Sequence, residues 1–140
     1  MDQEAGDSTP PFATRQLGEE YDVLAPDSSE IRRLVGTTRG SLTHGTLPPG
    51  QVSLAIAHRT VEEVWYVIAG RGQVWRKQGD HEVVVDVAPG TALTIPTGAH
   101  FQFRTTGSEP LRFIMCTMPP WPGEGEAVRV PDHWPVVEAD

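Results

Sequence analysis

His58 and Glu63 are the two residues of this sequence best suited to acid–base chemistry. They lie five positions apart on either side of the short turn 59–62, so the strands that carry them are sequence neighbours. If both side chains face one apolar cavity, each shifts the protonation of the other and supplies an acid or a base near neutral pH. Such a pair could transfer a proton in an isomerisation, a dehydration or a cyclisation.

The other reactive side chains are weaker candidates. His81 follows Gly79-Asp80 and is expected to be a solvated turn residue. Cys116 lies in the apolar run 113–116, and no neighbour in sequence marks it as a nucleophile. Arg76 and Arg104 could lie near the mouth of a barrel, but isolated cationic residues at strand ends are usually exposed.

The composition predicts one soluble domain and argues against several classes of partner. The chain has 140 residues, 38% of them hydrophobic, with 11 basic against 19 acidic residues and a net charge of −8. This acidic balance argues against nucleic-acid binding, and the apolar runs are too short to span a membrane. The single cysteine cannot form an internal disulfide, and the acidic N-terminus does not resemble a secretion signal, so we expect a cytoplasmic protein.

Short apolar segments separated by glycine or proline predict an all-β fold. Such spacing, with 14 glycines and 13 prolines, is typical of a sandwich or barrel. Residues able to adopt positive φ lie in 70–72 and 78–80, where they can close hairpins. The predicted strands are 30–35, 41–47, 52–58, 64–68, 73–76, 82–87, 92–95, 100–104 and 111–118.

Two motifs in this array resemble those of the cupin superfamily. In the first, Gly50 is followed after five residues by Ile56-Ala57-His58, then by Glu63 and finally by Gly70. In the second, Gly90 is followed after five residues by Pro96-Thr97-Gly98 and then by 99–105. The resemblance covers about half of the chain. It implies a double-stranded β-helix, a jelly-roll barrel whose interior holds a metal or a ligand.

The motifs depart from the family pattern at two metal-ligand positions. In typical cupins, two histidines and a glutamate of the first motif and one histidine of the second bind a divalent ion. This chain has Ile56 and Phe101 at two of those positions, so that only His58 and Glu63 match. Two protein ligands are too few for a tight site, so we predict no bound metal. A metal is the alternative if His100 or His44 completes the shell, although alternation places His100 on the face opposite Phe101.

Strand alternation predicts which side chains line the barrel interior. If Glu63 points inward, Trp65 and Val67 do so too, while Glu62 points outward. The same rule groups Ile56 with His58, and Phe101 with Phe103. These residues would form a mostly apolar ligand pocket with one imidazole and one carboxylate. The alternative is that the aromatic rings simply fill a closed barrel.

The chain is predicted to have three parts: a flexible segment 1–20, the barrel 21–118, and an extended tail 119–140 that packs on the outside of the barrel through Trp121. Residues 124–126 are expected to be solvated. Segment 30–35 and the tail could cover exposed edges in a homodimer.

Two functions follow from these residues. The first is an enzyme in which His58 and Glu63 act on a small molecule, and the second is a non-catalytic module that binds one. A metal-dependent cupin dioxygenase or isomerase is a third possibility, weakened by Ile56 and Phe101. The fold alone does not separate them.

Overall fold

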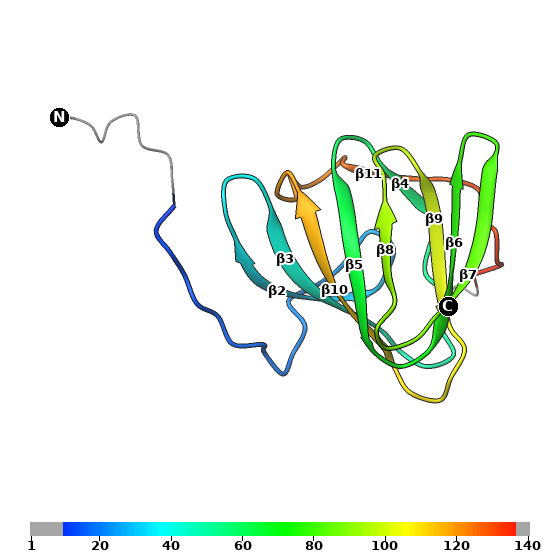
Figure 1. The fold of residues 1–140 in the computed structure, drawn as a ribbon, viewed down its shortest axis with the longest axis horizontal. Coiled ribbons are helices and arrows are strands. Elements are labelled where there is room, and N and C mark those ends of the chain that lie inside the picture. Colours follow the sequence, from blue (N-terminus) through cyan, green and yellow to red (C-terminus); the bar gives the residue numbers. More distant parts are fainter. Residues whose placement is uncertain (1–9, 137–140) are drawn as a thin grey trace.

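The protein is a single all-β domain built from two antiparallel sheets, as the computed structural model of residues 10–136 shows (Figure 1). The first sheet has six strands in the spatial order β1 (Val23–Leu24), β2 (Glu30–Gly36), β3 (Ser41–Leu47), β10 (Leu111–Met118), β5 (Glu62–Ala69) and β8 (Ala92–Ile95). The second has five, in the order β11 (Ala127–Arg129), β4 (Ile56–His58), β9 (His100–Thr105), β6 (Gly72–Gln78) and β7 (His81–Val87). This is the predicted jelly roll.

No helix in the described part of the chain is long and apolar enough to cross a membrane.

The alternation of side chains along β5 sets the two faces of the first sheet. Glu63, Trp65 and Val67 are buried, whereas Glu62, Val64, Tyr66 and Ile68 are exposed. Successive side chains of a strand point to opposite faces, so the first group must face the second sheet. The inward and outward assignments made for this strand from the sequence are therefore confirmed.

Gly70 allows β5 and β6 to be joined by a tight connection. Its φ of +80° lies in the left-handed region, and a Cβ atom there would collide with the carbonyl oxygen of Pro110. Glycine meets both requirements because it lacks a Cβ atom. The glycine at this point of the first motif is thus explained by local geometry.

An aromatic cluster fills the space between the two sheets. The ring of Trp65 stacks on Phe113 at 4.6 Å between centroids and meets Phe101 and Phe103 edge-on at 5.7 and 5.2 Å. Offset-stacked and edge-on pairs are the favourable geometries for such rings. These side chains, with Val67, belong to the hydrophobic core.

The segment predicted as a strand over 52–58 is regular only at its end. Ile56–His58 forms β4, while Val52 makes an isolated bridge to Arg104. The residues between them bond to two different parts of the fold: the Ser53 amide donates to the carbonyl of Phe103, and the Leu54 amide donates to the carbonyl of Asp27. Pairing with one neighbouring strand cannot provide both of these hydrogen bonds, so the observed strand is shorter than the predicted one.

The two ends of the domain contribute strands that the sequence did not indicate. β1 pairs with β2, and β11 in the tail pairs with β4, placing the tail at the edge of the second sheet. Residues 10–20 are exposed and contain no helix or strand. The predictions for residues 1–9 and 137–140 lie outside the described residues.

Candidate functional site

A cavity of about 180 Å³ opens between the inner faces of the two sheets, next to the aromatic core. It is mostly apolar, with polar side chains from β2, β3, β4, β5, β10 and the loop before β2. Its lining is Val23, Leu24, Ala25, Pro26, Asp27, Ile31, Arg33, Thr43, Ile56, His58, Glu63, Met115, Thr117 and Trp121.

His58 supplies the imidazole of the cavity from the buried strand β4. Its ring meets Phe101 edge-on at 5.2 Å and Trp121 at 5.4 Å, and these contacts fix its plane. Nδ1 is buried and has no hydrogen-bond partner among residues 10–136. Burial lowers the pKa of His58 below its ordinary value, against the opposing effect of the Asp27 and Glu126 carboxyls. The ring is therefore neutral at neutral pH.

Glu63 lies on β5 with both carboxyl oxygens occupied. Oε1 accepts a hydrogen bond from Nε1 of Trp65 at 2.9 Å, and Oε2 accepts one from the hydroxyl of Thr117 at 2.7 Å. The register places Thr117 directly opposite Glu63 on the neighbouring strand. Burial raises the pKa of Glu63 above its ordinary value, although both hydrogen bonds favour the charged form.

Asp27 is a second buried carboxyl in the cavity, which the sequence analysis did not identify. It lies in the loop between β1 and β2, where Oδ1 accepts bonds from the amide of Ser29 at 2.9 Å and from its hydroxyl at 2.6 Å. Burial raises the pKa of Asp27, Glu63 raises it further, and Ser29 and His58 oppose the rise. The short Asx-type loop sequence Asp27-Ser28-Ser29 was the available signal, but it indicates a turn and says nothing of a cavity.

The three titratable groups share one cavity but do not form the direct His–Glu pair. His58 and Glu63 both face the cavity, as the motif register predicts. No hydrogen bond between them exists in the described structure, and the carboxyls that act on the charge of His58 are Asp27 and Glu126. The arrangement combines a neutral imidazole with two carboxyls that hold their protons to a higher pH than usual. It can accept a proton at His58 and donate one from a carboxyl.

Most of the predicted apolar lining lies outside the cavity. Ile56 lines it, as expected. The predicted ligand contacts Trp65, Val67, Phe101 and Phe103 are absent from its lining and are packed into the core. All of them point inward as predicted. Inward direction alone did not predict the site, because these side chains fill the space that they face.

Two residues of the predicted tail belong to the surroundings of the site: Trp121, expected to pack on the outside of the barrel, and Glu126, expected to be solvated. Trp121 lines the cavity next to His58 and does not pack on the outer face of a sheet. Glu126 is 4% exposed, and its carboxylate accepts bonds from the amides of Thr60 and Val61. Burial raises the pKa of Glu126, but these bonds outweigh burial and the pKa is lowered overall.

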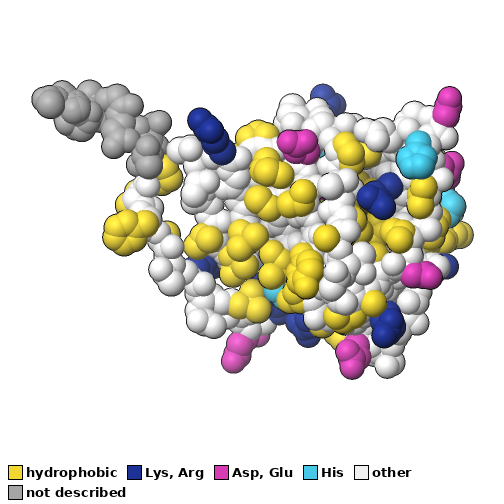
Figure 2. Space-filling model, viewed as in Figure 1, with side chains coloured by type: hydrophobic (Ala, Val, Ile, Leu, Met, Phe, Trp, Pro, Cys, Tyr) yellow, Lys and Arg dark blue, Asp and Glu magenta, His cyan; other side chains and the backbone are white. Residues whose placement is uncertain are grey.

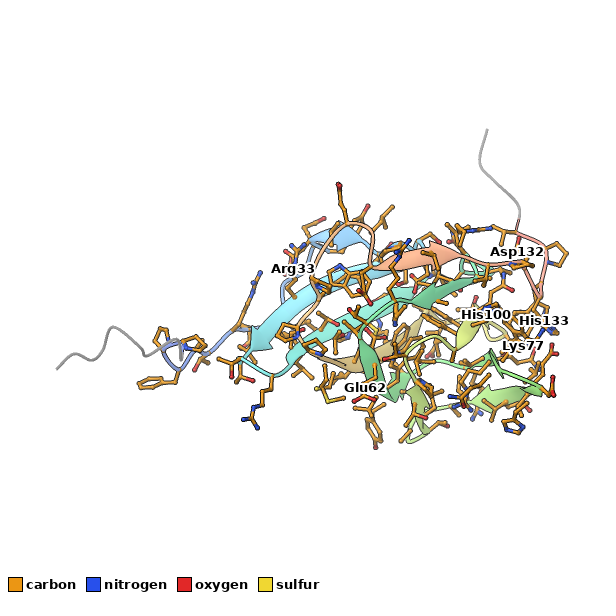
Figure 3. All side chains as sticks on the ribbon, turned by 90° about the horizontal axis from the view of Figure 1, so that it is seen from above. Arg33, Glu62, Lys77, His100, Asp132 and His133 are labelled. Carbon is orange, nitrogen blue, oxygen red and sulfur yellow. The ribbon has the colours of Figure 1, made fainter. Side chains whose placement is uncertain are left out.

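The residues present do not reproduce the metal site that the fold family implies. Ile56 and Phe101 carry no donor atoms, and the part of the chain that the structure describes has no group of three His, Cys, Asp or Glu positioned to hold an ion. His44 is adjacent to the cavity residue Thr43 on β3 and is absent from the lining. His100 pairs with Lys77 and lies with it at the end of the molecule away from Arg33 (Figure 3). Neither histidine completes the set.

A family model described as a cupin domain matches residues 43–117 of this chain. With the double-sheet fold and the cavity between its sheets, this match shows that the chain belongs to the cupin family. The uncharacterized protein MJ1618 of Methanocaldococcus jannaschii is 30% identical over an alignment of 114 residues, and the match covers 75% of this chain and 88% of that protein.

Solved structures agree with the fold. An uncharacterized protein with a double-stranded β-helix domain from Klebsiella pneumoniae has a TM-score of 0.62 at 18% identity, over 80% of this chain and 92% of its own. The capsular polysaccharide assembling protein CapF of Staphylococcus aureus has a TM-score of 0.65 at 18% identity. An oxalate decarboxylase of Bacillus subtilis, which has Mn(II) centres, has a TM-score of 0.65 at 16% identity.

This chain corresponds to about a third of the length of CapF and of the oxalate decarboxylase. The matches include 76% of this chain and 33% of CapF, and 80% of this chain and 30% of the oxalate decarboxylase. At this identity the likeness shows the fold alone.

Proposed function

We propose that this protein binds a small, mostly apolar molecule in the cavity and transfers a proton on it through His58. The observation that carries the proposal is the buried Nδ1 of His58, which has no partner among residues 10–136 in a cavity that also contains two carboxyls. An unpaired buried polar atom costs free energy, and a ligand that bonds to it removes that cost. The size and apolar lining are those of a site for a small organic molecule.

The protonation states favour His58 as the base. Its pKa is lowered by burial, so the ring is free to accept a proton, while the pKa values of Asp27 and Glu63 are raised. After His58 takes a proton and Asp27 gives one up, the Asp27 carboxylate favours the resulting imidazolium. This division of roles suits an isomerase, a dehydratase or a cyclase, each of which moves a proton between two positions of one substrate.

A non-catalytic binding protein is the second candidate, and one observation favours it. Both oxygens of Glu63 are already bonded to Trp65 and Thr117, so Glu63 must exchange a hydrogen bond before it can reach a ligand. In that case His58 only donates or accepts a hydrogen bond to the bound molecule. Substitution of His58 or Glu63 would then weaken binding by about 1–3 kcal/mol, the value of one strong hydrogen bond, with no reaction to lose.

Hydrogen–deuterium exchange of a bound carbonyl compound separates the two candidates. Small ketones with apolar side chains are incubated with the protein in D2O, and NMR follows exchange at the carbon next to the carbonyl. An enzyme of the proposed type speeds this exchange, and His58→Ala and Glu63→Gln each slow it strongly. The double variant should lose much less than the sum of the two losses, because the residues act as one unit. Binding without accelerated exchange contradicts the enzyme proposal and supports the binding protein.

We further propose that the protein is a cytoplasmic homodimer. The outward side chains of β5 are apolar and exposed, with Val64 at 44%, Tyr66 at 51% and Ile68 at 39%. Hydrophobic side chains gather on the face shown in Figure 2, over β3, β10 and β5. An apolar face of this kind is typical of a surface that a second copy covers.

A further inference from the structure

Arg33 lines the cavity from β2, and its guanidinium has no partner among residues 10–136. In residues 10–136 its side chain makes no ion pair or hydrogen bond, whereas its backbone amide donates to the carboxyl of Asp22. The adjacent Arg32 differs sharply. Its guanidinium donates to the carbonyls of Gly18 and Glu19, at 2.9 and 2.6 Å, and thereby anchors the chain before β1. Arg32 has a structural role, whereas that of Arg33 is unassigned.

Strand pairing explains why Arg33 reaches the cavity. Arg33 lies opposite Thr43, and Thr43 lies opposite Met115, so the three side chains share one row across β2, β3 and β10. Thr43 and Met115 also line the cavity. Arg32 is one residue away and points to the other face. Arg33 (labelled in Figure 3) lines the cavity and is exposed, so its side chain belongs to the open side of the cavity, which we call the mouth.

The carboxyl groups of the cavity have hydrogen-bond donors within the protein, whereas the guanidinium of Arg33 has no acceptor within residues 10–136. The acceptor Oδ1 of Asp27 is bonded to Ser29, and both oxygens of Glu63 are bonded to Trp65 and Thr117. Five N–H groups of the Arg33 guanidinium have no acceptor in the described protein. These N–H groups are available to a ligand that brings acceptors, and an arginine fork best matches the two coplanar oxygens of a carboxylate.

We propose that Arg33 selects a small carboxylic acid with an apolar body, binding its carboxylate at the mouth while the body lies in the cavity. This inference rests on the proposed ligand-binding function of the same cavity. Its volume of about 180 Å³ limits the ligand. A cavity of about 150 Å³ holds one benzene molecule, so the body is a single ring or a branched chain of similar size. Leu24, Ile31 and Met115 supply apolar contacts for it.

Paired neutral and charged probes test this inference. Benzoate and phenylacetate, with benzamide and phenylacetamide as matched neutral probes, are titrated at about pH 7 into the wild type, Arg33→Gln and Arg39→Gln. Arg39 lies on the exposed turn of the same β2–β3 hairpin, outside the cavity lining, and serves as the control. The wild type and Arg39→Gln should bind each acid at least about tenfold more tightly than its amide, since one ion pair of this kind is worth that much or more.

In Arg33→Gln the preference for the acid should fall to within about twofold, while amide binding changes little. An unchanged preference in Arg33→Gln, or equal affinity for acid and amide in the wild type, overturns the proposal. A further variant, Ile56→Trp, fills the cavity with a larger side chain. It shows whether a negative result concerns only the role of Arg33 or the binding of ligands in the cavity as a whole. If the amides bind and Ile56→Trp abolishes their binding, the cavity binds ligands whatever Arg33 does. If binding of either class persists in Ile56→Trp, or no probe binds at millimolar concentration, the cavity proposal fails along with this one.

Discussion

The hydrogen bond from Thr117 to Glu63 offers a quantitative test of the site's electrostatics. Thr117→Val removes the hydroxyl that donates to Oε2 at 2.7 Å but keeps the shape of the side chain. A bond to a charged acceptor contributes about 1.5–3 kcal/mol, and a bond to a neutral one about 0.5–1.5 kcal/mol. The loss of unfolding free energy should therefore be about 1–2 kcal/mol larger where Glu63 is ionised than where it is protonated.

The sign of the pH dependence follows from the same bond. The folded pKa of Glu63 is raised by burial, and removing the Thr117 bond raises it further because that bond favours the carboxylate. A raised folded pKa means that the carboxyl's contribution to stability is complete below its unfolded pKa and is lost as pH rises through the folded pKa. Thr117→Val should therefore lose about 0.5–1.5 kcal/mol of stability at about pH 4, where Glu63 is protonated, and about 1–2 kcal/mol more at about pH 9.

Urea unfolding at these two pH values measures the difference, with Thr117→Ser, which keeps the hydroxyl, as the control. The Ser variant should lose stability by a similar amount at both. Equal losses for Thr117→Val at the two pH values would refute the prediction that Glu63 is protonated at about pH 4, ionised at about pH 9 and bonded more strongly by Thr117 in its charged form.

Two further predictions concern metal content and assembly. Elemental analysis of protein purified without chelator should find far less than one divalent ion per chain, because Ile56 and Phe101 replace two imidazole ligands. A content of about one tightly held ion per chain would contradict this prediction. Light scattering should give about twice the chain mass of 15.3 kDa for the wild type. Tyr66→Glu should reduce it to the mass of one chain, and Val84→Glu on the other sheet should not. A wild-type monomer at micromolar concentration would argue against the dimer.

The strands and the inward direction of His58 and Glu63 were predictable from the sequence because they depend on local rules. The period-two burial of β5 and β10 is visible in the order of their residues, and both elements were predicted with boundaries within two residues. The cupin motif register correctly placed His58 and Glu63 toward one cavity. Such features depend on side-chain alternation and turn geometry, which act over a few residues.

The partners in the site depend on contacts between segments that are far apart in the chain. Asp27 is held beside the barrel by the bond from the Leu54 amide to its carbonyl, and Trp121 is brought over His58 by a tail that β11 attaches to β4. No periodicity links residues so distant in sequence. Their positions follow from tertiary packing, which also decided that Trp65 and Phe101 fill the core.

The sequence by itself determined that this chain forms a cupin-like barrel, that a histidine and a glutamate face its interior, and that two metal-ligand positions hold apolar residues. Only the tertiary structure decided how far the cavity extends, that Asp27 faces it with His58, and that the Arg33 side chain reaches it with no partner among residues 10–136. The physical reason is that strand alternation determines the direction of a side chain. Whether space is left in front of it depends on how tightly all the neighbouring side chains pack.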